Sequence, residues 1–417
     1  MSIEQRVSEY LNKMPGVKRY VKRVYQFFFY MISDKKKSEG NIIKVSPDDD
    51  YDYFFGYYDK SPWDTSGRYM LCLRARNTWS EDTPKEKADI VIIDTNKDYV
   101  DPERYRIVAQ TNTWNVQQGC MLQWLGPDYK SNIIFNDYRN GKYVSIIKNI
   151  NSLQEREIAI PIYSVSRDGK MALSLDFSRL YNLRPGYGYH NVEEETKGIP
   201  LPDTTAIWSV DLSDGHIQSL LQYSEFAEYL PRSEMKKREA VHKVNHIMIS
   251  PDGSKFMVLY RWFNGSKKFS RLMVCDIDGS NMRMLLDDDM VSHCCWKDDN
   301  TILAYAKKKD QGTGYYLIHD NSDKCERVWN ELTVDGHPSY SPDGKWVVTD
   351  TYADRARMCR IILLNKNEIR TVAKVFEPFK YDNETRCDLH PRWSRDGEMI
   401  CFDAAFEGRR GMYVLRK

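Results

Sequence analysis

The sequence predicts an all-β protein, a seven-bladed β-propeller preceded by an N-terminal amphipathic α-helical arm. Two observations support this fold class. From residue 40 onward, short β-like runs alternate with polar turns. Within that region Ser-Pro-Asp-Gly or a variant of it returns at seven places, at a spacing of roughly 40–60 residues with one longer gap. Units of this length, each built from about four strands, are typical of propeller blades.

The bulk composition narrows the classes of function. Of 417 residues, 41% are apolar and 13% aromatic, which allows a substantial core. The formal net charge of +1 creates no basic field, so we expect no nucleic-acid partner. The nine cysteines show no CxxC pairing, which favours reduced thiols. No signal peptide is evident, and the apolar run at 27–32 is far shorter than the ~20 residues of a membrane span. We therefore expect a cytoplasmic protein.

Residues 1–38 form the predicted arm, with a helix over 3–33. Apolar residues recur there at helical spacing and draw one stripe: Val17, Val21, Val24, Phe28 and Met31. Basic residues flank the stripe, at Lys18, Arg19, Lys22 and Arg23. Two interpretations stay open. The stripe packs on the body of the protein or on a partner chain, or it lies peripherally in an anionic membrane interface, at the inner face of the membrane.

Residues 39–417 form the predicted propeller. The serine or equivalent residue of each turn motif serves as an anchor for one blade, and the seven anchors are Asp64, Leu125, Ser166, Ser250, Lys297, Ser341 and Ser394. Asp and Gly tolerate the backbone angles of the tight turn, and an apolar strand follows it, as in 345–350.

Two irregularities of the repeat, an incomplete last blade and one long gap, lead to further expectations. The last anchor leaves room for about three strands, and residues 41–46 are the expected donor of the fourth, which would close the ring. The long gap between Ser166 and Ser250 predicts an insertion over 178–243, with a helix-like stretch at 224–240. Because insertions in repeat folds gather on one face, we interpret this one as a lid or substrate wall.

Four of the eight histidines share one register of the repeat. The position four residues before the anchor is Lys60, Met121 and Ile162 in the first three blades, and His246, His293, His337 and His390 in the last four. The innermost strand of each blade begins there, so we expect the four imidazoles to converge at one mouth of the central channel. Two interpretations stay open: the histidines form a metal site or an acid–base centre, or they are a polar lining of a water-filled channel, each bound to water or a neighbouring carbonyl.

Other polar residues favour an anionic ligand, since Lys and Arg bind carboxylate or phosphate. The substrate-binding candidates are Lys60, Arg74, Arg184, His190, Arg261 and Arg409. Arg184 and His190 belong to the predicted insertion.

The turn motif resembles that of TolB-type propellers over about 41–417. The mouth histidines, with His-Pro before the last two anchors, resemble those of oligogalacturonate lyases and, more loosely, ulvan lyases. This resemblance implies a divalent metal ion (Mn, Ca or Zn) held by His246, His337 and His390. It implies His293 or His242 as the base. The family's closely spaced His-x-His pair is absent, since His390 stands alone before Pro391.

The expected activity is therefore a metal-assisted β-elimination on an oligo- or polysaccharide that contains uronic acid. Arg184 and Arg261 would bind carboxylates, and the candidates for the general acid are Tyr58, Tyr187 and Tyr189. Two alternatives stay open: a non-catalytic glycan-binding or scaffold propeller, and an accessory protein of bacterial surface-polysaccharide biosynthesis.

Overall fold

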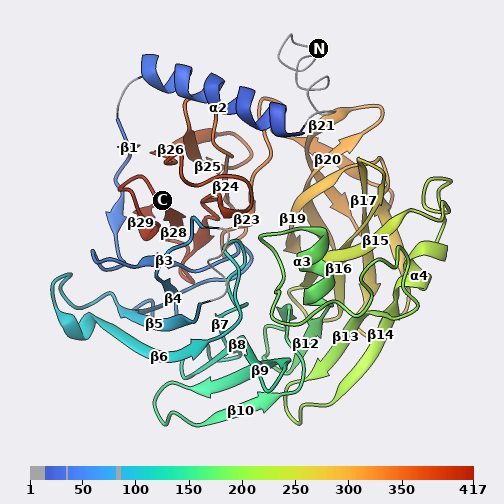
Figure 1. Ribbon diagram of the computed structural model, residues 1–417, viewed down its shortest axis with the longest axis horizontal. Helices are drawn as coiled ribbons and strands as arrows, with labels where there is room; N and C mark the ends of the chain where they lie inside the picture. The colour runs from blue at the N-terminus through green and yellow to red at the C-terminus, as the bar shows by residue number, and fades with distance from the viewer. Residues whose placement is uncertain (1–14, 34–35, 81–85) are drawn as a thin grey trace.

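Seven antiparallel sheets stand around a central axis in the computed structural model, which describes residues 15–33, 36–80 and 86–417 (Figure 1). Each sheet is one blade, and consecutive blades follow one another along the chain, so the seven-bladed propeller is confirmed. Six of the seven anchors follow the innermost strand of their blade, and Lys297 is the last residue but one of β19 (Val291–Asp298) in blade five.

Blades one to three come from the first half of the chain. Blade one contains β3 (Asp52–Phe54), β4 (Tyr69–Ala75), β5 (Ala88–Asp94) and β6 (Tyr105–Thr111), with the short helix η2 (Pro102–Arg104) before β6. Blade two contains β7 (Gln123–Trp124), β8 (Asn132–Arg139), β9 (Lys142–Asn149) and β10 (Glu155–Ile158). Blade three contains β11 (Ser164–Val165), β12 (Met171–Ser174), β13 (Thr205–Asp211) and β14 (Ile217–Gln222).

The other four blades follow. Blade four contains β15 (Val241–Ile249), β16 (Lys255–Asn264), β17 (Lys267–Asp276) and β18 (Arg283–Leu286). Blade five contains β19 (Val291–Asp298), β20 (Thr301–Lys308), β21 (Gly312–His319) and β22 (Cys325–Val328). Blade six contains β23 (Ser339–Tyr340), β24 (Val347–Asp350), β25 (Met358–Leu364) and β26 (Ile369–Phe376). Blade seven contains β27 (Arg392–Trp393), β28 (Met399–Ala404) and β29 (Gly411–Arg416), and the short helix η3 (Asn383–Thr385) precedes it.

The Ser-x-Asp-Gly motif builds its turn with its own side chains. In blade six the Ser341 hydroxyl donates to the Asp343 carboxylate at 2.6 Å and accepts from the amide of Trp346 at 3.0 Å. Gly344 takes a positive φ of 67°, which glycine adopts without strain. The same serine-to-aspartate bond forms at the other three clear copies, which begin at Ser166, Ser250 and Ser394. The motif is therefore explained by turn chemistry alone.

Strands from the N-terminal side complete the last two blades. β2 (Ile43–Lys44) pairs with β29 as the outermost strand of blade seven, with Ile43 opposite Val414. The predicted closure by residues 41–46 is thus confirmed. β1 (Ser38–Glu39) adds a fifth strand to blade six by pairing with β26.

The stretch predicted as one insertion, 178–243, is divided by blade three. β13 and β14 lie inside it, so the extra segments are the loops on either side of these two strands. The first holds helix α3 (Phe177–Leu183), and the second holds helix α4 (Tyr223–Glu228). The helix expected over 224–240 is thus limited to its first turn and a half, because residues 231–240 form turns. Asp176 caps the N-terminus of α3, because its carboxylate accepts a hydrogen bond from the backbone amide of Arg179.

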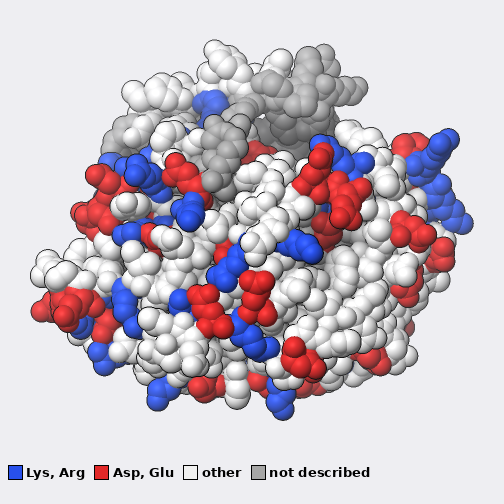
Figure 2. Space-filling view, turned by 60° about the horizontal axis from the view of Figure 1, so that its bottom comes forward, with Lys and Arg blue, Asp and Glu red and all other residues white. Residues whose placement is uncertain are grey.

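The N-terminal arm contains helix α2 (Pro15–Ile32), which lies at the rim beside blade six (Figure 1). The part of the predicted helix before Pro15 lies outside the described residues. On the face seen in Figure 2, acidic and basic side chains are interspersed, as the small net charge leads one to expect. Among the described helices, none is long and apolar enough to cross a membrane.

Candidate functional site at the propeller mouth

The four histidines of the shared register converge, as predicted. The ring centroids of His293 and His337 lie 4.2 Å apart, and those of His337 and His390 lie 4.3 Å apart. His246 is 6.3 Å from His293. All four side chains are buried. One imidazole from each of four consecutive blades therefore contributes to a single cluster.

The backbone explains why this register points inward. The β15–β16 ladder is irregular between Asn245 and Met248, and His246 there has a left-handed φ of 60°. Such a bulge turns a side chain away from the normal alternation of the strand. His390 has a φ of 44°, but Met121 at the same register of blade two has a φ of 56°. This left-handed backbone thus occurs at three of the seven register positions, with or without a histidine, and His293 and His337 join the cluster without it.

His246 is engaged by two tyrosines of blade one. Its Nδ1 is 3.2 Å from the hydroxyl of Tyr57, and its Nε2 is 2.9 Å from the hydroxyl of Tyr58. The carbonyl of Cys294 also lies 3.1 Å from Nε2. Burial holds the pKa of His246 well below its ordinary value. With both ring nitrogens occupied, His246 fits a positioning role better than the metal-ligand role expected from the sequence.

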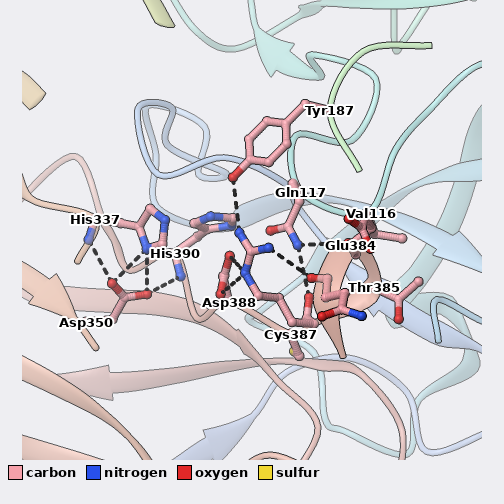
Figure 3. Close-up of polar contacts among 12 residues, drawn as sticks. Val116, Gln117, Tyr187, His337, Asp350, Glu384, Thr385, Cys387, Asp388 and His390 are labelled. Atoms are coloured by element: carbon pink, nitrogen blue, oxygen red, sulfur yellow. Dashed lines mark hydrogen bonds and ion pairs between the residues drawn. The ribbon is translucent and has the colours of Figure 1, made fainter. Parts of the chain in front are cut away.

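His337 is oriented by Asp350 at the end of β24 (Figure 3). Its Nδ1 lies 2.8 Å and 3.0 Å from the two carboxylate oxygens. The same carboxylate accepts from the backbone amide of His390 at 3.0 Å. Burial disfavours a charged imidazole, but Asp350 outweighs burial and raises the pKa of His337. The bond at Nδ1 leaves Nε2 of His337 directed away from Asp350.

Asp388 joins His337 and His390 in a group of possible metal donors. One donor atom from each residue lies within 4.8 Å of the others, and all three residues are buried. Nε2 of His337 and Nε2 of His390 have no hydrogen-bond partner among the described residues. A carboxylate that orients a ligating histidine through its second nitrogen is a recurring feature of metal sites. These residues therefore fit a divalent cation, with Asp388 in the place expected for His246.

His293 forms a second carboxylate–imidazole pair. Its Nδ1 lies 3.1 Å from Asp335, and Ser292 also donates to that carboxylate at 2.6 Å. Burial lowers the pKa of His293, so its ring is neutral near pH 7. Because Nδ1 is engaged, Nε2 is the nitrogen available to accept a proton.

Four cations gather beside this cluster without an acidic partner. None of Arg184, Lys243, Arg261 and Lys268 forms an ion pair within the described part of the chain. The Lys243 side chain is buried, and its Nζ has a single carbonyl contact at 3.4 Å, to Leu183. Burial and then Arg261 hold the pKa of Lys243 well below its ordinary value. Arg261, followed by burial, lowers the pKa of Lys268 to about 8.

Tyr187 connects the cations to the donor group. Its hydroxyl lies 3.5 Å from Arg184 and 3.4 Å from Arg386, and Arg386 contacts Asp388 at 2.8 Å (Figure 3). The guanidinium of Arg184 also stacks over the Tyr187 ring at 4.4 Å. Lys243 and Arg261 are buried, Arg184 is half-buried and Lys268 is exposed. A buried cation without an anionic partner is costly, so this group favours the binding of an anion.

The structure places the other candidates elsewhere. His242 is buried against Tyr260 in blade four, and burial lowers its pKa to about 4. Tyr189 stacks on Phe177 at 4.5 Å in the core. Lys60 pairs with Asp59 at 2.7 Å and lines a cavity of about 690 Å³ along the central channel.

Three further candidates lie at the rim. Arg74 pairs with Asp89 at 2.6 Å, and Arg409 lies 3.6 Å from Asp52. His190 lines a smaller cavity of about 270 Å³ beside Trp114 and Tyr181. None of the described hydrogen bonds or ring contacts joins these residues to the four histidines.

Several residues of the site were not among the candidates. Asp350 and Asp388 act on histidines of their own and the neighbouring blade. Lys243 belongs to β15, the innermost strand of blade four, and Lys268 belongs to β17 of the same blade. The sequence does point to Asp388, because it precedes His390 by two residues, as Asp335 precedes His337, and this spacing predicts carboxylates that orient the imidazoles. In the structure Asp335 orients His293 instead of His337.

The fold and the site together define a seven-bladed β-propeller with a histidine-rich mouth, and solved structures share this fold. An oligogalacturonate lyase in complex with manganese superposes with a TM-score of 0.65 and 15% identity, covering 92% of this chain and 95% of that one. Oligogalacturonate lyase from Vibrio parahaemolyticus superposes with a TM-score of 0.60 and 12% identity, covering 90% and 93%. At these identities the likeness shows the fold alone.

Sequence comparison gives shorter matches. The Tol-Pal system protein TolB of Francisella tularensis subsp. mediasiatica is 24% identical over 135 residues, which is 29% of this chain. The aligned stretch spans 31% of that relative's length. No model of a known protein family matches the sequence. The chain is therefore similar in sequence to TolB over part of its length, and it shares its overall fold with oligogalacturonate lyases.

Proposed function

We propose that this protein binds a divalent cation at His337, Asp388 and His390 and catalyses β-elimination on an oligosaccharide that contains uronic acid. The observation that carries the proposal is the pair of buried, unpartnered Nε2 atoms of the two histidines, which meet a carboxylate. Two imidazoles and one carboxylate suit Mn²⁺ or Zn²⁺, whereas Ca²⁺ prefers oxygen donors alone.

The cluster of unpaired cations supports an acidic substrate. Arg184, Arg261 and Lys268 would bind its carboxylates. The proton next to a uronate carboxylate is weakly acidic, so negative charge must be stabilised while it leaves. A bound divalent cation supplies part of that stabilisation as a Lewis acid.

His293 is the proposed base. Its Nε2 removes the proton beside the carboxylate, the electron pair forms the new C=C bond, and the neighbouring C–O glycosidic bond breaks. Asp335 holds the ring and stabilises the imidazolium that results. Tyr187, which lies between Arg184 and Arg386, donates the proton to the departing oxygen. Tyr58 is engaged with His246 and the carbonyl of Cys294, so it positions His246.

Metal analysis of the purified full-length chain tests the cation site. We expect about one equivalent of Mn²⁺ or Zn²⁺ to bind, and His337→Ala or His390→Ala to abolish this binding. The variant His216→Ala, which replaces an exposed histidine, is the matched control and should bind metal like the wild type. Equal metal content in all four proteins would contradict the site.

The reaction is tested separately with oligogalacturonates and other uronate oligosaccharides, by the ultraviolet absorbance of the unsaturated product. His293→Ala should keep the metal and lose activity by at least about 100-fold, because general base catalysis contributes roughly that factor. Binding of both metal and oligosaccharide without any unsaturated product would overturn the lyase and favour the glycan-binding propeller.

A further inference from the structure

Helix α2 presents its apolar stripe to solvent. All five residues of the stripe, at 17, 21, 24, 28 and 31, are exposed. The helix contributes nine of the twenty large hydrophobic residues that are exposed in the described part of the chain. Tyr20 is 72% exposed, and Phe28 is 59% exposed. An amphipathic helix that served only to cover the propeller would turn this face inward.

The opposite side of α2 fixes the helix to blade six. Arg23 binds Asp382 at 3.0 Å and the carbonyl of Phe379 at 2.8 Å. Gln26 is buried, and the Tyr30 ring stacks on Phe376 at 4.9 Å. Phe27 also meets the ring of Phe379 at 6.1 Å, and Arg355 stacks over Phe29 at 4.5 Å. These polar and aromatic contacts hold the helix in place and leave the apolar stripe outward.

We propose that α2 lies in the interface of an anionic lipid membrane and attaches the propeller to it. Besides Arg23, which binds Asp382, the helix sequence contains Lys18, Arg19 and Lys22 and no acidic residue. A helix that combines exposed aromatic and aliphatic side chains with basic residues matches the headgroup region of an anionic bilayer. Two copies of α2 packed face to face would bring their basic flanks together, and like charges would oppose that contact.

The place of α2 gives the attachment a functional meaning. Phe379 and Asp382, which α2 contacts, belong to the loop between β26 and β27 that also carries Arg386 and Asp388. The backbone amide of Cys387 in that loop is held by Glu377 at 2.8 Å. Membrane attachment would thus place the lipid surface next to the segment that supplies the donor group.

Vesicle flotation with the full-length chain tests this proposal. We expect the protein to float with vesicles of phosphatidylcholine and phosphatidylserine, and at least about tenfold less with phosphatidylcholine alone. The triple variant Tyr20→Ser, Val24→Ser and Met31→Ser should lose at least about tenfold in bound fraction. Its melting temperature should be unchanged, because these side chains are exposed.

A matched triple variant provides the control. Val100→Ser, Leu153→Ser and Leu230→Ser removes three equally exposed apolar side chains elsewhere and should float like the wild type. Absence of wild-type flotation, or equal loss in both triple variants, would overturn the proposal. A wild-type dimer that only the α2 variant dissociates would assign the stripe to a second copy instead. Activity on soluble oligosaccharide should be equal in all three proteins. A negative result for membrane attachment can therefore be told apart from a negative result for the proposed lyase activity.

Discussion

Asp350 accepts hydrogen bonds from both the ring and the backbone of His337. The ring Nδ1 lies 2.8 Å from Oδ1, and the backbone amide lies 2.8 Å from the same oxygen. Its second oxygen accepts from the backbone amide of His390 at 3.0 Å. One buried carboxylate of blade six thus fixes two histidines that come from different blades.

Replacing this carboxylate should loosen the donor group without removing a donor. In Asp350→Asn we expect metal affinity to fall by roughly 10–100-fold, because partners of this kind orient and polarise the ligating imidazole. Calorimetric titration with Mn²⁺ or Zn²⁺ measures the effect. Asp310→Asn alters an exposed acidic residue and should bind metal like the wild type. Unchanged affinity in Asp350→Asn would contradict the orienting role.

Lys243, the buried lysine of blade four, should lower the stability of the ligand-free protein and strengthen the binding of an acidic ligand. Lys243→Met removes a buried amino group that has no acidic partner, so the ligand-free protein should become more stable, by about 1–3 kcal/mol. The same variant should bind acidic oligosaccharides more weakly. Urea unfolding with and without the oligosaccharide measures both quantities.

Lys255→Met gives the matched comparison. Lys255 pairs with the buried Asp320 at 2.9 Å, so its loss should destabilise the protein. Destabilisation by both lysine variants would contradict the assignment of Lys243 to a ligand site.

Asp320 should make the contact between blades four and five sensitive to acid. It binds Lys255 at 2.9 Å and Arg283 at 2.9 Å. Burial alone would raise its pKa, but Arg283 and Lys255 outweigh burial and lower it. A carboxyl whose pKa is lower in the folded state stabilises the protein above the unfolded pKa of about 4, and this stability disappears as pH falls through the folded value.

Comparison of the wild type with Asp320→Asn measures this contribution. At pH 7 the variant should be less stable by about 2–3 kcal/mol, because Lys255 and Arg283 both lose their acidic partner. The expected loss is no larger, since Arg283 is partly exposed and water screens its charge. The difference should shrink progressively below pH of about 4. A difference in urea unfolding free energy that stays constant down to strongly acidic pH would contradict the pair.

Closure of the ring should depend on a backbone amide in the N-terminal segment. The amide of Val45 donates to the carbonyl of Met412 at 3.0 Å. Val45→Pro removes this donor and should cost about 3 kcal/mol or more, whereas Val45→Ala loses only side-chain packing. Thermal unfolding of both variants separates the two effects. Equal melting temperatures would show that the amide contact contributes nothing to closure.

Local sequence patterns sufficed for the architecture. The turn motif uses its own serine and aspartate side chains, so Ser341 and Asp343 are recognisable without knowledge of the rest of the chain. Closure by residues 41–46 followed from a missing strand in blade seven. The convergence of the histidines followed from their shared register, because equivalent positions of successive blades meet at the axis.

The details of the site depend on contacts between distant blades. His246 was expected to bind metal, but Tyr57 and Tyr58 of blade one occupy its ring nitrogens. No periodicity could reveal which blade meets which across the axis. Similarly, the stripe on α2 was visible in the sequence, but its direction depends on the contacts of Arg23 and Tyr30 with blade six.

The closure of blade seven by β2 also determines when the site can exist. Tyr57 is synthesised soon after β2, yet its ring meets His390, which is synthesised much later, at a centroid distance of 5.2 Å. During translation, the mouth can form only after the last blades have been synthesised, because it contains residues of both the first and the last blades. A nascent chain that is released early would therefore be an incomplete ring without the donor group, so the proposed metal binding would require the finished chain.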